Sequence, residues 1–293
     1  MVGGEALANQ VRMGGMRITP VVTSRFRLDG GSMFGVIPKV LWQHKAPADE
    51  MNRIDLNVNT LVIETEGHVI VIEPGMGSKY DEKQRGIYAL DSLDTESALA
   101  DAGIDPAGVD MVVPTHLHLD HAGGSTSYRE QGDPKSCFPN ARFVVQEAEL
   151  QAAIAPGPLE RGSYNPDDYV PLQASGDLEV VSGDCEIAPG VSVELTGGHT
   201  RGHQVVRFKS EGEEGLFLGD IVPTLAHLKL NWLMAWDLEP QVVFEQKERL
   251  LSDAAARGVT CFFPHDPRVV GCRLEAGSKG SFQPVPDTII EAI

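Results

Sequence analysis

Four side chains that commonly bind metal ions lie within six residues of this chain: His116, His118, Asp120 and His121. They follow Asp110–Pro114, an apolar run ended by proline that is typical of a short buried strand. In extended backbone, residues two apart point the same way, so His116 and His118 can converge on one metal ion. Asp120 and His121 come after the chain turns and can face a second ion.

The chemistry of these side chains indicates a metal centre with two ions. Imidazole nitrogens and carboxylate oxygens suit zinc and the neighbouring first-row metals. Gly123 and Gly124 follow the cluster and allow unusual dihedral angles and close approach of another backbone. The alternative is a surface loop that happens to be rich in histidine, and this alternative is disfavoured if other segments supply further ligands.

Three later segments repeat one pattern, an apolar strand that ends in a side chain able to bind metal. These side chains are His199, Asp220 and His265. Strand ends at a common edge are where open sheets place their sites. A single histidine after a strand is a weak signal. Because the three cases follow a dense ligand cluster, the sequence predicts that they complete the ligand set.

The remaining periodic segments predict two groups of strands separated by helices. The predicted strands are 17–26, 59–65, 68–73 and 143–146, and the predicted helices are 92–103, 147–154, 240–257 and a short one from about residue 286. Asp29-Gly30-Gly31 predicts a turn. This arrangement suits the α/β (α+β) class and an αβ/βα four-layer sandwich of two mixed sheets.

Length and charge limit the organisation of the chain and its partners. With 293 residues and no low-complexity linker, we expect a single domain over residues 16–293. Residues 1–15 are glycine-rich and weakly patterned, so we expect a disordered lead-in. The formal net charge of −18 disfavours binding to nucleic-acid phosphates and to anionic membranes.

The cysteines and the first residues bear on location. Cys137, Cys185, Cys261 and Cys272 are far apart and form no Cys-x-x-Cys motif, which favours free thiols in a reducing compartment. Residues 1–15 lack the apolar core of a signal peptide, and no run reaches the roughly 18 apolar residues of a membrane span. A soluble cytoplasmic protein is expected, with export without a leader left open.

Two connecting segments leave alternatives open. Residues 32–42 are unusually apolar for a connection, so they form either a buried loop or arm, or a flap over the site or a homodimer contact. The polar insertion at 157–171 contains Tyr164 and Tyr169. It forms either part of a pocket wall or a plain surface loop.

The order His-x-His-x-Asp-His, Gly-His, Gly-Asp and Pro-His resembles the pattern of the metallo-β-lactamase superfamily, from about residue 18 to the end of the chain. The pattern is specific for the fold and the metal site, and poorly specific for substrate. The resemblance implies two divalent metal ions, with zinc as the default and manganese, iron or cobalt also compatible. It assigns metal 1 to His116, His118 and His199, metal 2 to Asp120, His121 and His265, and Asp220 as the bridge.

Three segments resemble a subgroup that contains quorum-quenching N-acyl-homoserine lactone lactonases and is related to methyl parathion hydrolases: 29–42, 163–164 and 219–227. Better-known lactonases carry a tyrosine three residues after the bridging aspartate, where this chain has Pro223. The substrate must then be polarised by metal or another donor. His227 and Tyr164 are candidate catalytic residues, and His227 could equally be a supporting or surface histidine.

Two more positions relate to the superfamily pattern. Glu73 stands where the superfamily usually has an aspartate that steadies the metal loop, and its longer side chain leaves that hydrogen bond open. His203 follows His199 in the motif Gly-His-Thr-x-Gly-His. We expect His203 to support a ligand rather than to bind metal.

The resemblance implies a dinuclear hydrolase that opens N-acyl-homoserine lactones by attack of a hydroxide held between the two ions. Asp120 would orient this hydroxide or relay its proton. A glyoxalase II-like thioesterase shares the ligand set and is the first alternative, and a phosphotriesterase is the next. The charge disfavours a nuclease, His118 disfavours a flavodiiron oxidoreductase, and the lack of a signal segment disfavours an exported β-lactamase. A non-catalytic metal-binding protein is the alternative of another class.

Overall fold

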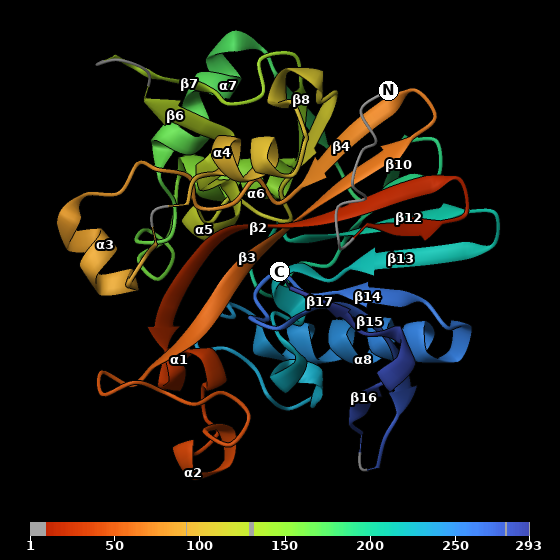
Figure 1. The fold of residues 1–293 in the computed structure, drawn as a ribbon. Coiled ribbons are helices and arrows are strands. Elements are labelled where there is room, and N and C mark those ends of the chain that lie inside the picture. The colour runs from red at the N-terminus through yellow and green to blue at the C-terminus, as the bar shows by residue number, and fades with distance from the viewer. Residues whose placement is uncertain (1–9, 92, 129–131, 279, 293) are drawn as a thin grey trace.

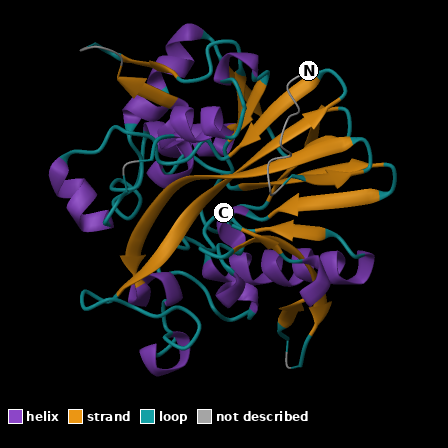
Figure 2. Cartoon of the chain, viewed as in Figure 1, coloured by secondary structure: helices purple, strands orange, loops and turns teal. Residues whose placement is uncertain are grey.

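The computed structural model describes residues 10–91, 93–128, 132–278 and 280–292, and most of its strands form two large mixed sheets (Figures 1 and 2). The first sheet has the order β1 (Val11–Met13), β2 (Met16–Asp29), β3 (Arg53–Thr65), β4 (His68–Ile72), β5 (Met111–Val113), β8 (Arg142–Gln146) and β9 (Leu178–Val181). The second has the order β10 (Cys185–Ala188), β11 (Val191–Leu195), β12 (Gln204–Ser210), β13 (Glu213–Phe217), β14 (Thr260–Phe262), β15 (Val269–Ala276) and β16 (Phe282–Pro284), with β17 (Ile290–Glu291) paired to β15. A separate hairpin joins β6 (Thr126–Tyr128) to β7 (Pro134–Ser136).

The two sheets pack face to face, and helices cover their outer faces (Figure 1). Apolar side chains from both sheets, such as Ile63 and Phe217, belong to one buried cluster between them. The helices α4 (Thr95–Asp101) and α7 (Val170–Ser175) pack on the outer face of the first sheet. The long helix α8 (Pro240–Arg257) covers the second sheet. The predicted αβ/βα sandwich is confirmed.

Parallel pairing brings the carboxyl ends of four strands to one edge of the sandwich. Strand β4 runs parallel to β5, and β13 runs parallel to β14. The residues that follow these four ends are Glu73, the loop 114–118, Asp220 and His265. Asn59 of β3 donates its backbone N–H to the Pro264 carbonyl at 2.8 Å and links the two sheets there. The fold therefore gathers the predicted ligands at a shared edge.

The longer helices lie where periodicity predicts them. Helix α6 (Glu147–Ile154) and helix α8 have the predicted bounds. Pro240 occupies the first turn of α8, and Gly258 ends that helix in a left-handed conformation with φ of 70°. Helix α4 begins at Thr95 rather than at 92, because the Asp94 carboxylate accepts a hydrogen bond from the Ser97 N–H and caps the helix. Residue 92 lies outside the described residues.

Both chain ends differ from the sequence prediction. Val11–Met13 forms β1 against β2, so the expected disorder of the lead-in is wrong for these residues, and residues 1–9 lie outside the described part. The predicted C-terminal helix is instead a 3-10 turn at Pro286–Thr288 followed by β17. Strand β15 offers backbone partners there, and pairing with it replaces a helix too short to be stable alone. That residues 16–293 act as one domain stays a prediction.

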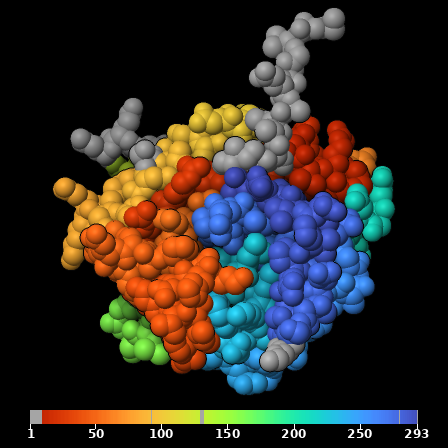
Figure 3. All heavy atoms as spheres, turned by 60° about the horizontal axis from the view of Figure 1, so that its bottom comes forward, coloured from red at the N-terminus to blue at the C-terminus, as the bar shows by residue number. Residues whose placement is uncertain are grey.

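The apolar connection at 32–42 folds into two short helices, α1 (Gly30–Phe34) and α2 (Lys39–Trp42). The predicted turn at Asp29 is a helix cap, since its carboxylate accepts from the Ser32 N–H. Phe34 and Trp42 are buried, whereas Val36 is 94% exposed. Figure 3 shows this segment, in orange, beside cyan and blue surface from the C-terminal third of the chain. The segment therefore has a core face and an apolar outer face.

Two further expectations concern cysteines and membranes. All four cysteines are free thiols, as predicted, and three of them are buried. Among the described helices, none is long and apolar enough to cross a membrane.

Candidate metal centre

The predicted ligand loop leaves the end of β5 and turns into the short helix α5 (Leu119–Ala122). His116 and His118 lie on the extended part, and His118 has a β-type backbone with φ of −63° and ψ of 152°. Asp120 and His121 lie inside the helix. This change of backbone type places His116 and His118 on extended chain, and Asp120 and His121 on a short helix.

The predicted ligands make close mutual contacts. Nδ1 of His118 lies 3.3 Å from Nε2 of His199, and Nε2 of His121 lies 3.0 Å from Nε2 of His265. One oxygen of Asp220 lies 3.4 Å from Nε2 of His121 and 3.3 Å from Nε2 of His199. Its other oxygen lies 3.3 Å from Nε2 of His265. Asp220 therefore contacts both halves of the cluster.

Three overlapping sets of residues could each hold a metal ion, because the ligand atoms within each set all lie within 4.8 Å of one another. They are His116 with His118 and His199, His116 with His121 and Asp220, and Asp120 with His121 and His265. All seven residues predicted as ligands belong to at least one set. The structure thus brings together every side chain that the sequence proposed for metal binding.

The donor atoms in this cluster fit a divalent cation. Nε2 of His116 and Oδ1 of Asp220 are buried and have no hydrogen-bond partner in the described part of the chain. Burial, together with the charges of neighbouring histidines, lowers the pKa of His116 and of His118 well below the usual value, so both rings are neutral. Buried polar atoms without partners are costly, and a bound cation would satisfy them with nitrogen and oxygen ligands.

Glu73 supports the ligand loop at two points. Its Oε2 lies 2.7 Å from Nδ1 of His121, and its Oε1 accepts the Thr115 N–H at 2.9 Å. The longer side chain therefore makes the hydrogen bond that the sequence left open. Glu73 adopts φ of 60°, a conformation that costs a non-glycine residue on the order of 1–3 kcal/mol and that persists only where its surroundings enforce it.

Two further supporting residues were missed from the sequence. Asp237 accepts from Nδ1 of His199 at 2.9 Å, and its second oxygen accepts the Met234 N–H at 2.9 Å. The Asn57 carbonyl accepts from Nδ1 of His265 at 2.8 Å. These bonds fix which ring nitrogen faces the centre. Asp237 lies in an irregular loop, and a backbone carbonyl carries no residue signal, so local patterns could not reveal either contact.

His203 supports Asp220, as expected, and is not a member of the ligand sets. Its Nδ1–H donates to Oγ1 of Thr196 at 2.7 Å, which leaves Nε2 to accept the backbone N–H of Asp220 at 3.0 Å. Gly219 has φ of 50°, and a Cβ there would lie 2.5 Å from Nε2 of His203. The glycine is therefore required for His203 to approach and hold Asp220.

Tyr164 lies beside His118, and its hydroxyl is bonded to another protein side chain. The hydroxyl donates to Oε1 of the buried Glu149 at 3.1 Å, and the ring contacts His118 edge to face at 5.0 Å. Glu149 also accepts the Leu117 N–H at 2.9 Å and the Thr200 hydroxyl at 2.6 Å. Tyr164 thus helps to hold the ligand loop against α6.

His227 is fully buried, and both of its ring nitrogens have protein partners. Nε2 donates to the Met33 carbonyl at 2.8 Å, and Nδ1 accepts from the Thr224 hydroxyl at 2.8 Å. Its ring stacks on Phe34 at 4.8 Å between centroids. Burial lowers the pKa of His227 to about 3, so the ring is neutral. This placement offers no contact with a substrate, unlike the catalytic role considered from the sequence.

Gly124 shows the close backbone approach that the sequence predicted. A Cβ at Gly124 would lie 2.1 Å from the Pro74 carbonyl oxygen, and its N–H donates to the Gly75 carbonyl at 2.7 Å. This contact packs the loop after β4 against the turn that follows α5. Glu73 is thereby brought next to His121.

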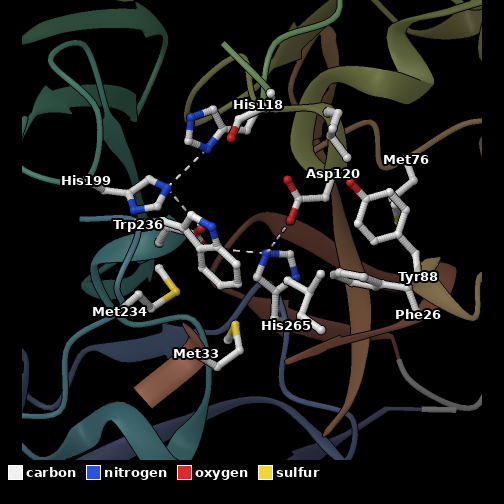
Figure 4. Close-up of a pocket in the computed structure, with 15 residues that line it drawn as sticks. Phe26, Met33, Met76, Tyr88, His118, Asp120, His199, Met234, Trp236 and His265 are labelled. Atoms are coloured by element: carbon white, nitrogen blue, oxygen red, sulfur yellow. Dashed lines mark hydrogen bonds and ion pairs between the residues drawn. The ribbon is translucent and has the colours of Figure 1, made fainter. Parts of the chain in front are cut away.

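A cleft of about 600 Å³, including its open mouth, lies over the ligand cluster (Figure 4). Its polar floor is formed by His118, Asp120, His199, Asp220 and His265, and its walls are largely apolar. Figure 4 shows Phe26, Met76 and Tyr88 on the side of Asp120, and Met234 and Trp236 on the side of His199. Gly162 and Ser163 also line the cleft, so the insertion at 157–171 contributes to its wall as one of the two alternatives predicted.

Comparison with known proteins agrees with this geometry. The family model of the metallo-beta-lactamase superfamily matches residues 53–265. A solved structure of a probable metal-dependent hydrolase from Staphylococcus aureus is 30% identical, covers 96% of this chain and 98% of its own, and has a TM-score of 0.86.

Two more distant relatives are named as lactonases. An N-acyl homoserine lactonase of Bacillus thuringiensis is 24% identical over 229 residues, which are 73% of this chain and 82% of the relative. The dizinc quorum-quenching lactonase AidC, solved with N-hexanoyl-L-homoserine, is 18% identical, covers 94% of this chain and 96% of its own, and shares the fold with a TM-score of 0.77. The chain belongs to the metallo-β-lactamase superfamily and is a hydrolase of that superfamily.

Proposed function

We propose that this hydrolase opens N-acyl-homoserine lactones with two bound divalent metal ions, zinc being the first choice. The observation that carries the proposal is the position of the cleft, in which a largely apolar wall surrounds a floor of clustered ligands. An acyl chain would bury against side chains such as Met33, Met234 and Trp236, while the lactone carbonyl reaches the floor. Relatives named as lactonases support the same substrate class.

The proposed ligand sets divide the floor into two halves. His116, His118 and His199 would hold one ion, and Asp120, His121 and His265 the other. Asp220 would bridge them, because its two oxygens contact histidines of both sets. When bound, the ions supply a hydroxide nucleophile at neutral pH and a positive charge for the carbonyl oxygen.

The protein groups orient the reactants and move the proton. Asp120 is partly exposed to the cleft, and its Oδ2 lies 3.6 Å from Nε2 of His265 and 3.7 Å from Nε2 of His121. It can accept the proton of the attacking water there and release it toward the leaving oxygen. The apolar walls exclude other water from the ester.

Phosphotriester hydrolysis is a second candidate, favoured by one feature. Phe26, Tyr88 and Trp236 line the same cleft, and aromatic walls suit the aryl leaving group of such esters. A thioesterase would use the same floor. The three reactions use the same ligand geometry, so they are distinguished by comparing rates on the three classes of substrate.

The test compares acid release from an N-acyl-homoserine lactone, a thioester and an aryl phosphotriester at fixed metal loading. We expect the lactone to give the highest kcat/KM. Asp220→Ala should abolish turnover and lower metal content, whereas Asp55→Ala, which alters an exposed carboxylate paired with Arg27, should change neither. Preference of fully metallated protein for a thioester or phosphotriester by tenfold or more would reject the lactonase proposal.

We also propose a homodimer through the outer face of α1 and α2. Val36, Val40 and Leu41 are 94%, 65% and 55% exposed, an unusual concentration of apolar surface on one short segment. Sedimentation at micromolar concentration should show a dimer that Val40→Asp together with Leu41→Asp converts to monomer. A wild-type protein that sediments only as a monomer would exclude it.

The cytoplasmic location is likewise a proposal. It is supported by the four free thiols, which suit a reducing compartment. Recovery of the protein with exported marker proteins after cell fractionation would contradict it.

A further inference from the structure

Pro223 stands three residues after Asp220, where better-known lactonases carry a tyrosine. In this structure it makes a backbone contact instead. Its carbonyl accepts the His265 N–H at 2.9 Å, so this residue positions a ligand and offers no donor to a substrate. Tyr164 and His227 have their polar atoms bonded to protein. A side-chain donor to the substrate would therefore have to come from another part of the cleft.

The cleft contains three side chains, apart from its charged and histidine residues, that carry an O–H or N–H donor. They are Tyr88, Ser163 and Trp236. Tyr88 is the last residue of α3 (Glu82–Tyr88), and Figure 4 shows its ring in the wall with the hydroxyl directed toward Asp120. This places the hydroxyl beside the half of the floor formed by Asp120 and His265.

Tyr88 differs from the other tyrosines in having a hydroxyl without a protein partner. The other four hydroxyls all donate to protein. Tyr80 donates to the Leu119 carbonyl and Tyr169 to the Ala153 carbonyl. Tyr128 donates to the Asp167 carboxylate and Tyr164 to the Glu149 carboxylate. Among the described residues, none forms a hydrogen bond with the Tyr88 hydroxyl. Its donor capacity is therefore available to a molecule in the cleft.

The backbone around Tyr88 holds the ring in place. Arg53 of β3 donates from one guanidinium nitrogen to the carbonyls of Gly86 and Ile87, at 3.0 and 3.1 Å. Ala89 then ends the helix with φ of 44°, and Leu90 is buried in the core beside the cleft. Because both flanks are fixed, Tyr88 is a part of the wall and not a freely moving surface side chain.

We propose that Tyr88 is a catalytic residue whose hydroxyl donates a hydrogen bond to the leaving-group oxygen of the substrate. In lactone opening, the acyl C–O bond breaks and its electron pair stays on the ring oxygen. The proton given up by the attacking water ends on that oxygen, while Tyr88 keeps its own proton. A donor aimed at an oxygen that gains charge during the reaction lowers the barrier.

The electrostatics of the cleft keep this hydroxyl protonated. Burial, and after it the negative charge of Asp120, raise the pKa of Tyr88 above its usual value. Tyr88 is therefore a donor throughout the neutral range.

The inference rests on the proposed hydrolysis of an ester at this floor, and the test uses leaving groups of different basicity. Tyr88→Phe removes only the hydroxyl. For an aliphatic lactone, whose ring oxygen leaves as an alkoxide, we expect kcat/KM to fall about 10- to 100-fold, as for loss of a hydrogen bond to a charge. For a lactone whose ring oxygen leaves as a phenolate, we expect a fall of less than about threefold, because this weaker base gains less from a donor.

Two controls separate this role from a structural one. Tyr128→Phe removes a hydroxyl that donates to Asp167 away from the ligand floor, and it should leave both substrates unchanged. Metal content and melting temperature of Tyr88→Phe should equal those of wild type. Affinity for the ring-opened hydroxy acid, followed by quenching of the fluorescence of Trp236 in the cleft, should weaken about three- to tenfold.

Equal losses for both lactones, or no loss for either, would overturn the assignment. A selective loss in Ser163→Ala instead would assign the donor to Ser163. If wild type does not open lactones, the lactonase proposal fails while the Tyr88 assignment is still tested. Tyr88→Phe and Tyr128→Phe are then assayed on alkyl and aryl esters of the class that the protein does hydrolyse.

Discussion

Oε2 of Glu73 lies 2.7 Å from Nδ1 of His121, and both side chains are completely buried. The same carboxylate also accepts the N–H of Thr115, the residue before the first ligand. One side chain at the end of β4 therefore sets both the ring orientation of a ligand and the path of the ligand loop. Metal affinity should depend on a residue that does not itself belong to a ligand set.

Glu73→Gln should lower metal affinity about 10- to 100-fold, because the amide retains one oxygen and cannot accept from both His121 and Thr115. The measurement is zinc retention against a chelator of known affinity. Glu64→Gln alters a more exposed carboxylate that pairs with Arg17 and should retain wild-type affinity. Equal affinity of the Glu73 variant and wild type would remove this support role.

Tyr164→Phe should change kcat/KM by less than about threefold and lower the free energy of unfolding by about 1 kcal/mol. The reason is that its hydroxyl serves Glu149, at 3.1 Å, and not the cleft. Steady-state kinetics and urea unfolding on the same preparation check both values. A hundredfold loss of kcat with unchanged stability would instead restore the catalytic role considered from the sequence.

His227→Gln should raise KM about three- to tenfold and leave kcat within about threefold. The neutral ring positions the backbone of Met33, whose side chain lines the cleft, so its loss moves a wall and not a reacting group. Because the pKa of His227 is about 3, the pH profile of kcat above pH 5 should be unchanged. Loss of kcat at constant KM would indicate a chemical role.

Lys247 is predicted to make stability depend on pH. It is buried on α8 and donates to the Trp232 carbonyl at 2.7 Å, and burial lowers its pKa from 10.5 to about 7. Between these values the unfolded chain holds a proton that the folded chain releases. The lysine therefore destabilises the fold at low pH, and this penalty shrinks as pH rises above about 7.

Urea unfolding at pH 7 and pH 9 tests this dependence. The unfolding free energy of wild type minus that of Lys247→Met should rise with pH, by no more than about 1.4 kcal/mol per unit. The same difference for Lys209→Met, an exposed lysine, should stay flat. A wild-type advantage that shrinks as pH rises would contradict the burial argument.

The sequence predicts the ligand floor well because each ligand follows an apolar strand or lies in one dense cluster. His199, Asp220 and His265 carry that signal in their own neighbourhood, and the sheet order then brings them together. Glu73 came from the resemblance instead, since it stands where the superfamily usually has an aspartate that steadies the metal loop.

The walls and supports of the site carry no such local signal. Asp237 and Tyr88 act through contacts with His199 and the cleft that only the tertiary fold creates. His227 shows the converse case, in which a histidine near a ligand in sequence is directed into the core by stacking on Phe34. The C-terminal strand β17 likewise depends on a partner, β15, that periodicity cannot supply.

In the proposed function, two metal ions on this floor drive lactone hydrolysis. The most direct measurement is pH-stat acid release from an N-acyl-homoserine lactone by metal-free protein, with zinc added stepwise and bound zinc counted in the same sample. We predict no release without metal, and a rate that rises and saturates at two zinc ions per chain. Equal acid release by metal-free protein, or no release with two zinc ions bound, would rule out the proposed metal-dependent hydrolysis.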